Sequence, residues 1–278
     1  MRLLAYAAVL PLLLVCSARS EVPGEIRFRY ERGLIWVKAE IPGKEEALNF
    51  LLDSGAGFSV LDLGRARTLG MRVGNPELVQ GVNGRAIAYR VNEFQLVSGG
   101  ITLPKSVFAI DLQTLSTCCH QHIDGILGMD FFRGRIVQID FAERRVRLLD
   151  KRSLSLANCE VLPIKMCNDA VCVPVRVGGN PAQWMRLDTG CDEALEWVAG
   201  RTENRRMDVA SIGLPSKSID YINASVQLGK QYFRAVKTGV HGEQMFSGEA
   251  GLLGNALLSK FLVTIDEPGG RAIFEPVR

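Results

Sequence analysis

Short runs of alternating apolar and polar residues, each closed by glycine or proline, dominate the chain from about residue 25 onward. Residues 34–41 (LIWVKAEI) alternate and then turn at Pro42-Gly43, and residues 171–177 (VCVPVRV) do the same before Gly178-Gly179. A period of two is typical of half-buried strands. The same reasoning predicts further strands over residues 48–52, 92–97, 146–149, 183–187 and 224–228.

Helical patterns are few and short. They predict helices over residues 63–69 and 194–200, and single turns after residues 125–128 and 251–254. A parallel βαβ fold needs crossover helices of roughly ten or more residues, so we expect a mostly β protein instead. Proline lacks the backbone N–H of a sheet ladder, so Pro174 marks its strand as an edge strand or a bulged one.

One internal repeat organises the chain. The segment NFLLDSGAG at residues 49–57 recurs as WMRLDTGCD at residues 184–192, which places Asp53 and Asp188 at matching positions. GILG at residues 125–128 recurs as GLLG at 251–254, and IVQID at 136–140 recurs as LVTID at 262–266. Three blocks in the same order predict two copies of one fold. We expect a first lobe over residues 21–152 and a second lobe over residues 153–278.

The repeated Asp-Ser/Thr-Gly turn carries the candidate chemistry. A two-fold arrangement of the copies would bring the carboxyl groups of Asp53 and Asp188 face to face. Two carboxylates a few Å apart hold one proton between them and titrate as a unit. The ionised group can then take a proton from a bound water while the protonated group polarises a carbonyl. Such a pair can hydrolyse an amide without a metal or a covalent intermediate.

The residues after each aspartate fit this arrangement. Gly55 and Gly190 permit the close backbone approach that the pairing requires. The hydroxyl groups of Ser54 and Thr189 are expected to brace the opposite strand and keep the carboxyl groups coplanar. A lone Asp-Thr-Gly is ordinarily only a turn, but two copies in register favour a functional pair.

With these motifs the sequence resembles the aspartic proteases of the retropepsin and pepsin group. In that family each catalytic aspartate lies in an Asp-Thr/Ser-Gly turn above a hydrophobic-hydrophobic-Gly segment. Here residues 53–55 with 126–128, and 188–190 with 252–254, match that pattern, and GILGMDFF at 125–132 is close to bacterial retropepsin-like proteins. The resemblance spans residues 25–278. It implies an all-β fold of two homologous retropepsin-like β-barrel lobes, related by a pseudo-two-fold axis, with the active-site cleft between them.

A β-hairpin flap covers the cleft in this family. Gly81, Val82, Asn83 and Gly84 lie where such a flap would fall, and Asn-Gly is itself a strong hairpin signal. The matching residues 212–218 lack the paired glycines, so we expect one working flap, from the first lobe. The alternative is that residues 81–84 are an ordinary hairpin tip.

Two positions depart from the family pattern. Ala56 and Cys191 stand where pepsin-like enzymes place a hydroxyl group that supports the ionised pair. We therefore expect a pH optimum between weakly acidic and neutral, less acidic than that of pepsin. Cys191 is interpreted first as a small buried residue, with a disulfide partner or a redox-sensitive thiol as alternatives.

Composition narrows the class of protein. Of 278 residues, 47% are hydrophobic and 23% are charged, which is ordinary for a globular chain and excludes a disordered one. The net charge of +3 includes Arg2 and Arg19, the charged residues of segment 1–20, so a chain starting at Glu21 has a net charge of only +1. That charge lacks the basic excess of a nucleic-acid-binding protein.

The N-terminal segment 1–20 has the form of a signal peptide. Arg2 supplies a positive charge, residues 3–15 are apolar, and Ala18 and Ser20 are small residues before a cut at Glu21. The apolar run is too short to cross a hydrocarbon core of about 30 Å, so we expect an exported, periplasmic or secreted protein without a membrane span. A membrane anchor or buried helix, and lipidation of Cys16, are the alternatives.

Export changes the interpretation of the cysteines. An even number of cysteines in an oxidising compartment suggests disulfides, and the candidates after signal removal are Cys118, Cys119, Cys159, Cys167, Cys172 and Cys191. Their pairing stays open, although neighbours Cys118 and Cys119 are expected to have separate partners. The run CCHQH at 118–122 is more crowded than the usual spacing of zinc ligands, so we expect no metal and no cofactor.

The sequence therefore predicts a monomeric, single-chain aspartic endopeptidase that cleaves extended polypeptides, with Asp53 and Asp188 as the catalytic residues. The alternative is a non-catalytic peptide- or envelope-binding module on the same fold, against which the presence of both aspartates argues. A serine hydrolase fits poorly because the chain has no Gly-x-Ser-x-Gly motif.

Overall fold

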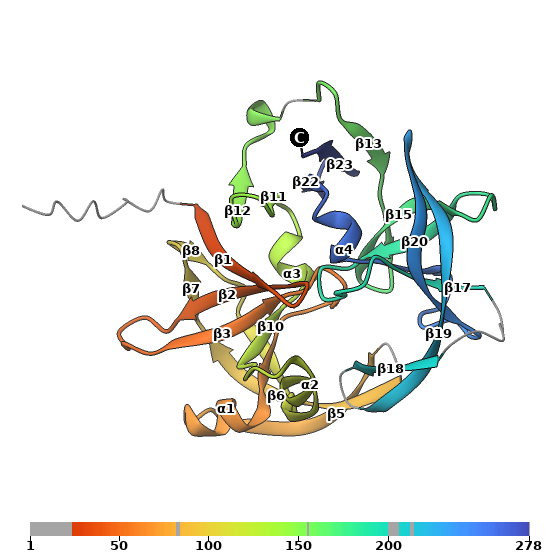
Figure 1. The fold of residues 1–278 in the computed structure, drawn as a ribbon. Helices are drawn as coiled ribbons and strands as arrows, with labels where there is room; N and C mark the ends of the chain where they lie inside the picture. Colours follow the sequence, from red (N-terminus) through yellow and green to blue (C-terminus); the bar gives the residue numbers. More distant parts are fainter. Residues whose placement is uncertain (1–23, 82–83, 155, 200–205, 212–213, 278) are drawn as a thin grey trace, which may run out of the picture.

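The computed structural model describes residues 24–277 except residues 82–83, 155, 200–205 and 212–213. The expected signal peptide and Cys16 lie outside the described residues. Within the described part of the chain, no helix is both long enough and apolar enough to cross a membrane. Figure 1 shows a mostly β molecule, with the first half of the chain on the left and the second half on the right.

The first lobe consists of short strands with a few helical turns between them. Its helices are α1 (Leu63–Thr68), α2 (Gln113–Cys119) and α3 (Met129–Phe132). Its strands are β1 (Glu25–Glu31), β2 (Leu34–Glu40), β3 (Ala47–Leu52), β4 (Val60–Asp62), β5 (Val73–Gly81), β6 (Gly84–Phe94), β7 (Val97–Ser98), β8 (Ile101–Thr102), β9 (Ser106–Ile110), β10 (Gly125–Leu127), β11 (Ile136–Asp140) and β12 (Arg145–Leu149).

A 3₁₀ turn, η1 (Lys151–Ser153), follows β12 and leads into the second lobe, whose helix is α4 (Asn255–Leu258). Its strands are β13 (Glu160–Pro163), β14 (Lys165–Cys167), β15 (Ala170–Val177), β16 (Gln183–Leu187), β17 (Leu195–Val198), β18 (Arg206–Ser211), β19 (Leu214–Leu228), β20 (Gln231–His241), β21 (Gly251–Leu253), β22 (Phe261–Asp266) and β23 (Arg271–Pro276).

The two lobes share one strand order. In the first lobe the order is β1-β2-β3-β10-β4-β9-β6-β5, and in the second it is β14-β15-β16-β21-β17-β20-β19-β18. The repeated blocks occupy the same places, because β10 pairs in parallel with β3 and β21 pairs in parallel with β16. The internal repeat is therefore a repeat of topology.

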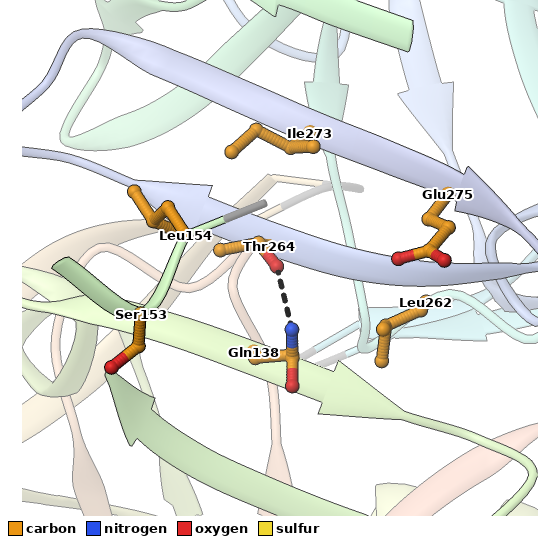
Figure 2. Close-up of a pocket in the computed structure, with 7 residues that line it drawn as sticks. All are labelled: Gln138, Ser153, Leu154, Leu262, Thr264, Ile273 and Glu275. Carbon is orange, nitrogen blue, oxygen red and sulfur yellow. Dashed lines mark hydrogen bonds between the residues drawn. The ribbon is translucent and has the colours of Figure 1, made fainter. Parts of the chain in front are cut away.

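A bridging sheet, formed by β13, β23, β22, β11, β12 and β1, joins the two lobes. At its middle, β11 pairs antiparallel with β22, and Gln138 lies opposite Thr264, its counterpart in the repeat. Matching residues that face each other mark a local two-fold relation between the copies. Gln138 Nε2 donates to Thr264 Oγ1 over 3.3 Å, inside a small hollow that is also lined by residues of η1, β22 and β23 (Figure 2).

Buried apolar side chains continue from one lobe into the other as a single core. The residues just before the aspartates, Leu52 and Leu187, belong to it, as do Leu127 and Leu253 of the parallel neighbours. Burial of such side chains stabilises a fold by about 1.5–3 kcal/mol each. Both Asp-Ser/Thr-Gly turns are therefore attached to well-packed strands.

The structure corrects one element and adds another. Residues 194–200, expected to be helical, contain strand β17 instead, because this segment pairs with β21 on one side and with β20 on the other. Helix α2 was not expected. Pro174 lies in a gap between two strand neighbours of β15. On the side of β15 away from β16, pairing with β14 ends at Cys172 and pairing with β19 begins only at Val175, so no ladder bond is lost at the proline.

Each lobe carries a hairpin at the matching place. In the first lobe β5 pairs with β6 as far as Gly81 opposite Gly84, and in the second β18 pairs with β19 as far as Ser211 opposite Leu214. The second lobe thus also carries a hairpin, and the expectation that only the first-lobe hairpin works as a flap stays a prediction. β19 contacts β6, and β18 contacts α2, so the hairpins approach each other at the bottom of Figure 1. Val82 and Asn83 lie outside the described residues.

Candidate active site

The two aspartates come directly after the central parallel strands of their lobes. Asp53 follows β3, and its backbone N–H donates to the carbonyl of Leu127 on β10 over 2.9 Å. Asp188 follows β16, and its N–H donates to the carbonyl of Leu253 on β21 over 3.0 Å. The hydrophobic-hydrophobic-Gly segments thus hold the turns in place from beneath.

The aspartates face each other across the junction of the lobes. A Cβ atom on Gly55 would lie 2.5 Å from Oδ1 of Asp188, and a Cβ atom on Gly190 would lie 2.6 Å from Oδ1 of Asp53. Each glycine of one turn therefore lies against the carboxyl group of the other turn. The two carboxyl groups are close enough to hydrogen-bond to each other. A larger residue at either glycine would separate them.

Ser54 and Thr189 form a reciprocal brace between the lobes, as the sequence predicts. The Thr189 hydroxyl accepts from the N–H of Ser54 (2.9 Å) and donates to the carbonyl of Leu52 (2.8 Å). The Ser54 hydroxyl accepts from the N–H of Thr189 (3.2 Å) and donates to the carbonyl of Leu187 (2.7 Å). Both side chains are buried, so these hydrogen bonds fix one turn against the other in a water-poor setting.

The two carboxyl groups have different backbone partners. Oδ1 of Asp53 accepts from the N–H groups of Gly55 (2.9 Å) and Ala56 (3.0 Å). Oδ1 of Asp188 accepts from the N–H of Gly190 (2.8 Å). The next N–H groups, of Ala56 and Cys191, each donate to the main-chain carbonyl of their own aspartate (3.2 and 3.3 Å), but that of Cys191 makes no bond to the carboxylate. The backbone therefore stabilises a negative charge on Asp53 more than one on Asp188.

Burial and proximity change the acidity of the pair. Burial raises the pKa of Asp53, against the opposing effect of its hydrogen bonds to Asp188, Gly55 and Ala56. Burial, and next the charge of Asp53, raise the pKa of Asp188 well above its usual value. The two groups titrate together, so they hold one proton over an intermediate pH range.

A charged residue lies beside this pair that the sequence analysis did not single out. Arg186, on β16, is 2% exposed and forms a buried ion pair with Glu249, which is also 2% exposed. Its positive charge lowers the pKa of Asp53 and of Asp188. Aligning the two copies of the repeat would have identified Arg186, because it occupies the strand position at which the first copy has the apolar Leu51.

Cys191 is a buried thiol, in agreement with the first interpretation of this residue. Burial, and next the charges of Glu196 and Asp188, raise its pKa well above the usual value of a thiol. A protonated, buried thiol is a poor nucleophile and a poor metal ligand. The residue therefore acts as a small side chain beneath the turn.

The expected disulfides do not form in the structure. All six candidates are reduced thiols: Cys118, Cys119, Cys159, Cys167, Cys172 and Cys191. Cys167 and Cys172 lie on the neighbouring strands β14 and β15, and burial, the charge of Glu249 and the nearby Cys167 raise the pKa of Cys172. In the described part of the chain, no three His, Cys, Asp or Glu side chains gather as metal ligands do.

The structure thus brings together six of the predicted site residues, namely Asp53, Ser54, Gly55, Asp188, Thr189 and Gly190. Gly81 and Gly84 end the paired strands of the first hairpin. Two β lobes that each supply one aspartate to a facing pair are the arrangement expected of the aspartic protease class.

Comparisons with known proteins agree with this class. Residues 37–131 match an aspartyl protease family profile. No curated protein sequence matches the chain significantly. Among solved structures, the aspartic proteinase from Irpex lacteus matches 91% of this chain and 97% of its own with a TM-score of 0.55, at 12% sequence identity. Over residues 37–131 the chain thus resembles aspartyl proteases in sequence, and over most of its length it has the fold of an aspartic proteinase.

Proposed function

We propose that this protein is an aspartic endopeptidase that hydrolyses peptide bonds with a water molecule activated by Asp53 and Asp188. The observation that carries the proposal is the reciprocal packing of each glycine against the opposite aspartate, braced by Ser54 and Thr189. This arrangement keeps two carboxyl groups in contact, and a pair of this kind suits general acid–base hydrolysis.

The hydrogen bonds suggest how the pair divides the work. Asp53, with two backbone N–H donors, carries the negative charge and accepts a proton from the attacking water. Asp188 holds the shared proton and donates a hydrogen bond to the carbonyl oxygen of the scissile bond. The tetrahedral intermediate then collapses as a proton passes to the leaving amine, and the pair returns to its singly protonated state.

The surroundings of Asp53 favour apolar substrate side chains. Ala56 and Phe58 pack against an apolar cluster that includes Leu51 and Ile126, and Val79 of the first hairpin packs against the same cluster. An extended peptide lying between this surface and the hairpins would place apolar side chains beside the scissile bond.

The test is peptide cleavage by carboxyl-to-amide variants. Asp53→Asn and Asp188→Asn should each abolish cleavage of a mixed peptide library while leaving thermal unfolding cooperative. Asp169→Asn is a matched control, because its side chain is 78% exposed and asparagine tolerates its positive φ. Full activity in either of the first two variants would refute the assignment.

A non-catalytic peptide-binding module on the same fold is the competing function. It would bind a peptide-like transition-state analogue such as pepstatin, seen as a raised melting temperature, yet the wild-type protein would leave the peptide library intact. The endopeptidase proposal requires both binding and cleavage.

We further propose that the protein is exported as a monomer after removal of residues 1–20. The support is the sequence of the segment 1–20 itself. Mass spectrometry of the mature N-terminus distinguishes cleavage before Glu21 from lipidation of Cys16, and light scattering gives the oligomeric state. An intact N-terminus on protein recovered from cells would contradict export by this route.

A further inference from the structure

Arg186 and Glu249 form a two-point ion pair that other side chains support. Arg186 Nε donates to Glu249 Oε2 over 2.7 Å, and Nη2 donates to Oε1 over 2.6 Å. Asn168 Nδ2 also donates to Glu249 Oε1, over 2.8 Å. The Phe246 ring covers the guanidinium, whose carbon lies 3.6 Å from the ring centre. The arginine is thus held rigidly in one orientation.

The fold does not require charges at these positions. In the repeat, Arg186 corresponds to Leu51, and Glu249 corresponds to Ile123, two residues before the GILG block. Leu51 and Ile123 are both buried in the apolar cluster of the first lobe. Because buried ion pairs are generally no more stabilising than apolar side chains of similar volume, an apolar pair would suit the second lobe equally well. The charges therefore call for a role other than packing.

The remaining donor of Arg186 points to that role. Its Nη1 atom crosses to the first lobe and donates to the carbonyl of Gly55 over 2.5 Å. That carbonyl belongs to the same peptide group as the N–H of Ala56, which donates to Oδ1 of Asp53 over 3.0 Å. A cation bound to the oxygen of a peptide group polarises it and strengthens the hydrogen bond that its N–H makes.

The relation has no mirror image in the other lobe. A leucine side chain at position 51 has no donor to offer to the carbonyl of Gly190. The N–H groups of Ala56 and Cys191 both donate to the backbone carbonyl of their own aspartate (3.2 and 3.3 Å), but only that of Ala56 also donates to a carboxylate oxygen. The peptide group after Gly55, with its bonds to Arg186 and to the Asp53 carboxylate, therefore distinguishes the two otherwise equivalent aspartates.

We propose that Arg186, held by Glu249, is a positioning residue that fixes and polarises the Gly55–Ala56 peptide group from the opposite lobe and so makes Asp53 the ionised member of the pair. The proposal rests on the proposed function of the same site. It assigns Arg186 no contact with the substrate, because its side chain is almost fully buried and every donor nitrogen has a partner.

The charges around the pair determine what removal of Arg186 does. Besides the two aspartates, the titratable groups that interact with them or with the guanidinium are Arg186 itself, Glu249, Cys172 and Cys191, and Glu196 and Asp192 act on Cys191 in turn. Arg186 is the cation of this set. Without it, ionisation of either carboxyl group is less favourable, and both proton-loss steps of the pair move to higher pH.

The chain itself offers the substitution that tests the proposal. Arg186→Leu/Glu249→Ile gives the second lobe the residues of the first, removes both charges together and leaves no buried charge unpaired. The expected result is a folded protein in which kcat falls about tenfold or more and both limbs of the pH profile move upward by about one pH unit. If this variant does not fold, Arg186→Met/Glu249→Gln removes the same charges with side chains of closer shape, and the same shifts are expected.

Arg271→Gln is the matched control. It removes a cation from the ion pair with Asp266, on the bridging sheet of the same lobe, and should leave the pH profile unchanged. A structural role for Arg186 alone would change the melting temperature of the double variant while its pH profile stayed that of the wild type. That result would overturn the proposal.

A second readout separates this proposal from the proposed function. The proton-loss steps of the pair can be followed by NMR of ¹³C-carboxyl-labelled aspartate, which requires no turnover. If the wild type cleaves no peptide but the titration moves upward in the double variant, endopeptidase activity is refuted and the role of Arg186 stands. If the wild type cleaves peptides and neither the titration nor the profile moves, the role of Arg186 is refuted and the function stands.

Discussion

The brace between Ser54 and Thr189 yields a quantitative prediction. Thr189→Val keeps the shape of the side chain but removes the hydroxyl that serves the N–H of Ser54 (2.9 Å) and the carbonyl of Leu52 (2.8 Å). Both partners belong to buried residues, so valine leaves two backbone groups unsatisfied. Each such group costs about 1–3 kcal/mol, and the free energy of unfolding should fall by about 2–6 kcal/mol.

Denaturant unfolding followed by tryptophan fluorescence measures this loss. Ser54→Ala is the mirror-image test, since it strips the carbonyl of Leu187 and the N–H of Thr189 in the same way, and a loss of similar size is expected. Thr117→Val is the control: its exposed hydroxyl donates to the carbonyl of Gln113 within α2, so the change should stay within about 0.5 kcal/mol. A loss below about 1 kcal/mol in Thr189→Val would refute the view that these hydrogen bonds fix the turns.

Three further predictions follow from the same geometry. Gly55→Ala or Gly190→Ala should abolish peptide cleavage, measured on a peptide library, because the added Cβ would overlap the opposite carboxyl group; retained activity would show that the turns separate without harm. Asp188→Asn should raise the melting temperature at pH 7 but little at pH 3. The folded protein holds the Asp188 proton more tightly than the unfolded chain does, so the wild type loses stability as the pH rises above 3.8, whereas asparagine does not titrate. An equal gain at both pH values would contradict the raised pKa. In the native protein an alkylating reagent should modify exposed Cys118 well before buried Cys191, as mass spectrometry of the digested protein can establish, and the reverse order would contradict the burial.

The sequence predicted the parts of the fold that depend on local pattern. Strands β2 and β15 form where apolar and polar residues alternate, β3 and β16 form at the expected segments before the aspartates, and α1 forms within one residue of the expected range. Residues 194–200 were mispredicted because ALEWVAG has apolar residues at helical spacing, while its conformation is decided by β20 and β21 on either side. Pairing with strands that are distant in sequence outweighs local propensity.

Parallel pairing was the other feature beyond the reach of local pattern. The scarcity of helices excluded a βαβ sheet, yet β3 pairs in parallel with β10 and β16 pairs in parallel with β21. A parallel pair needs only a crossover long enough to return the chain to the same end. Here the intervening strands of the lobe supply that connection. Few helices therefore exclude a βαβ sheet but do not exclude isolated parallel pairs of strands.

The repeat predicts the symmetric part of the site, and its departures show where the symmetry is broken. Two equivalent lobes would leave no reason for the proton to prefer one aspartate over the other, so a fixed division of roles must come from residues that differ between the copies within reach of the pair. Alignment of NFLLDSGAG with WMRLDTGCD shows Arg186 opposite Leu51, two residues before each aspartate. In the sequence alone such an arginine is only an exception to the apolar pattern of its strand. The structure gives it a role, because Glu249 stabilises its charge and the carbonyl of Gly55 in the other lobe accepts its hydrogen bond.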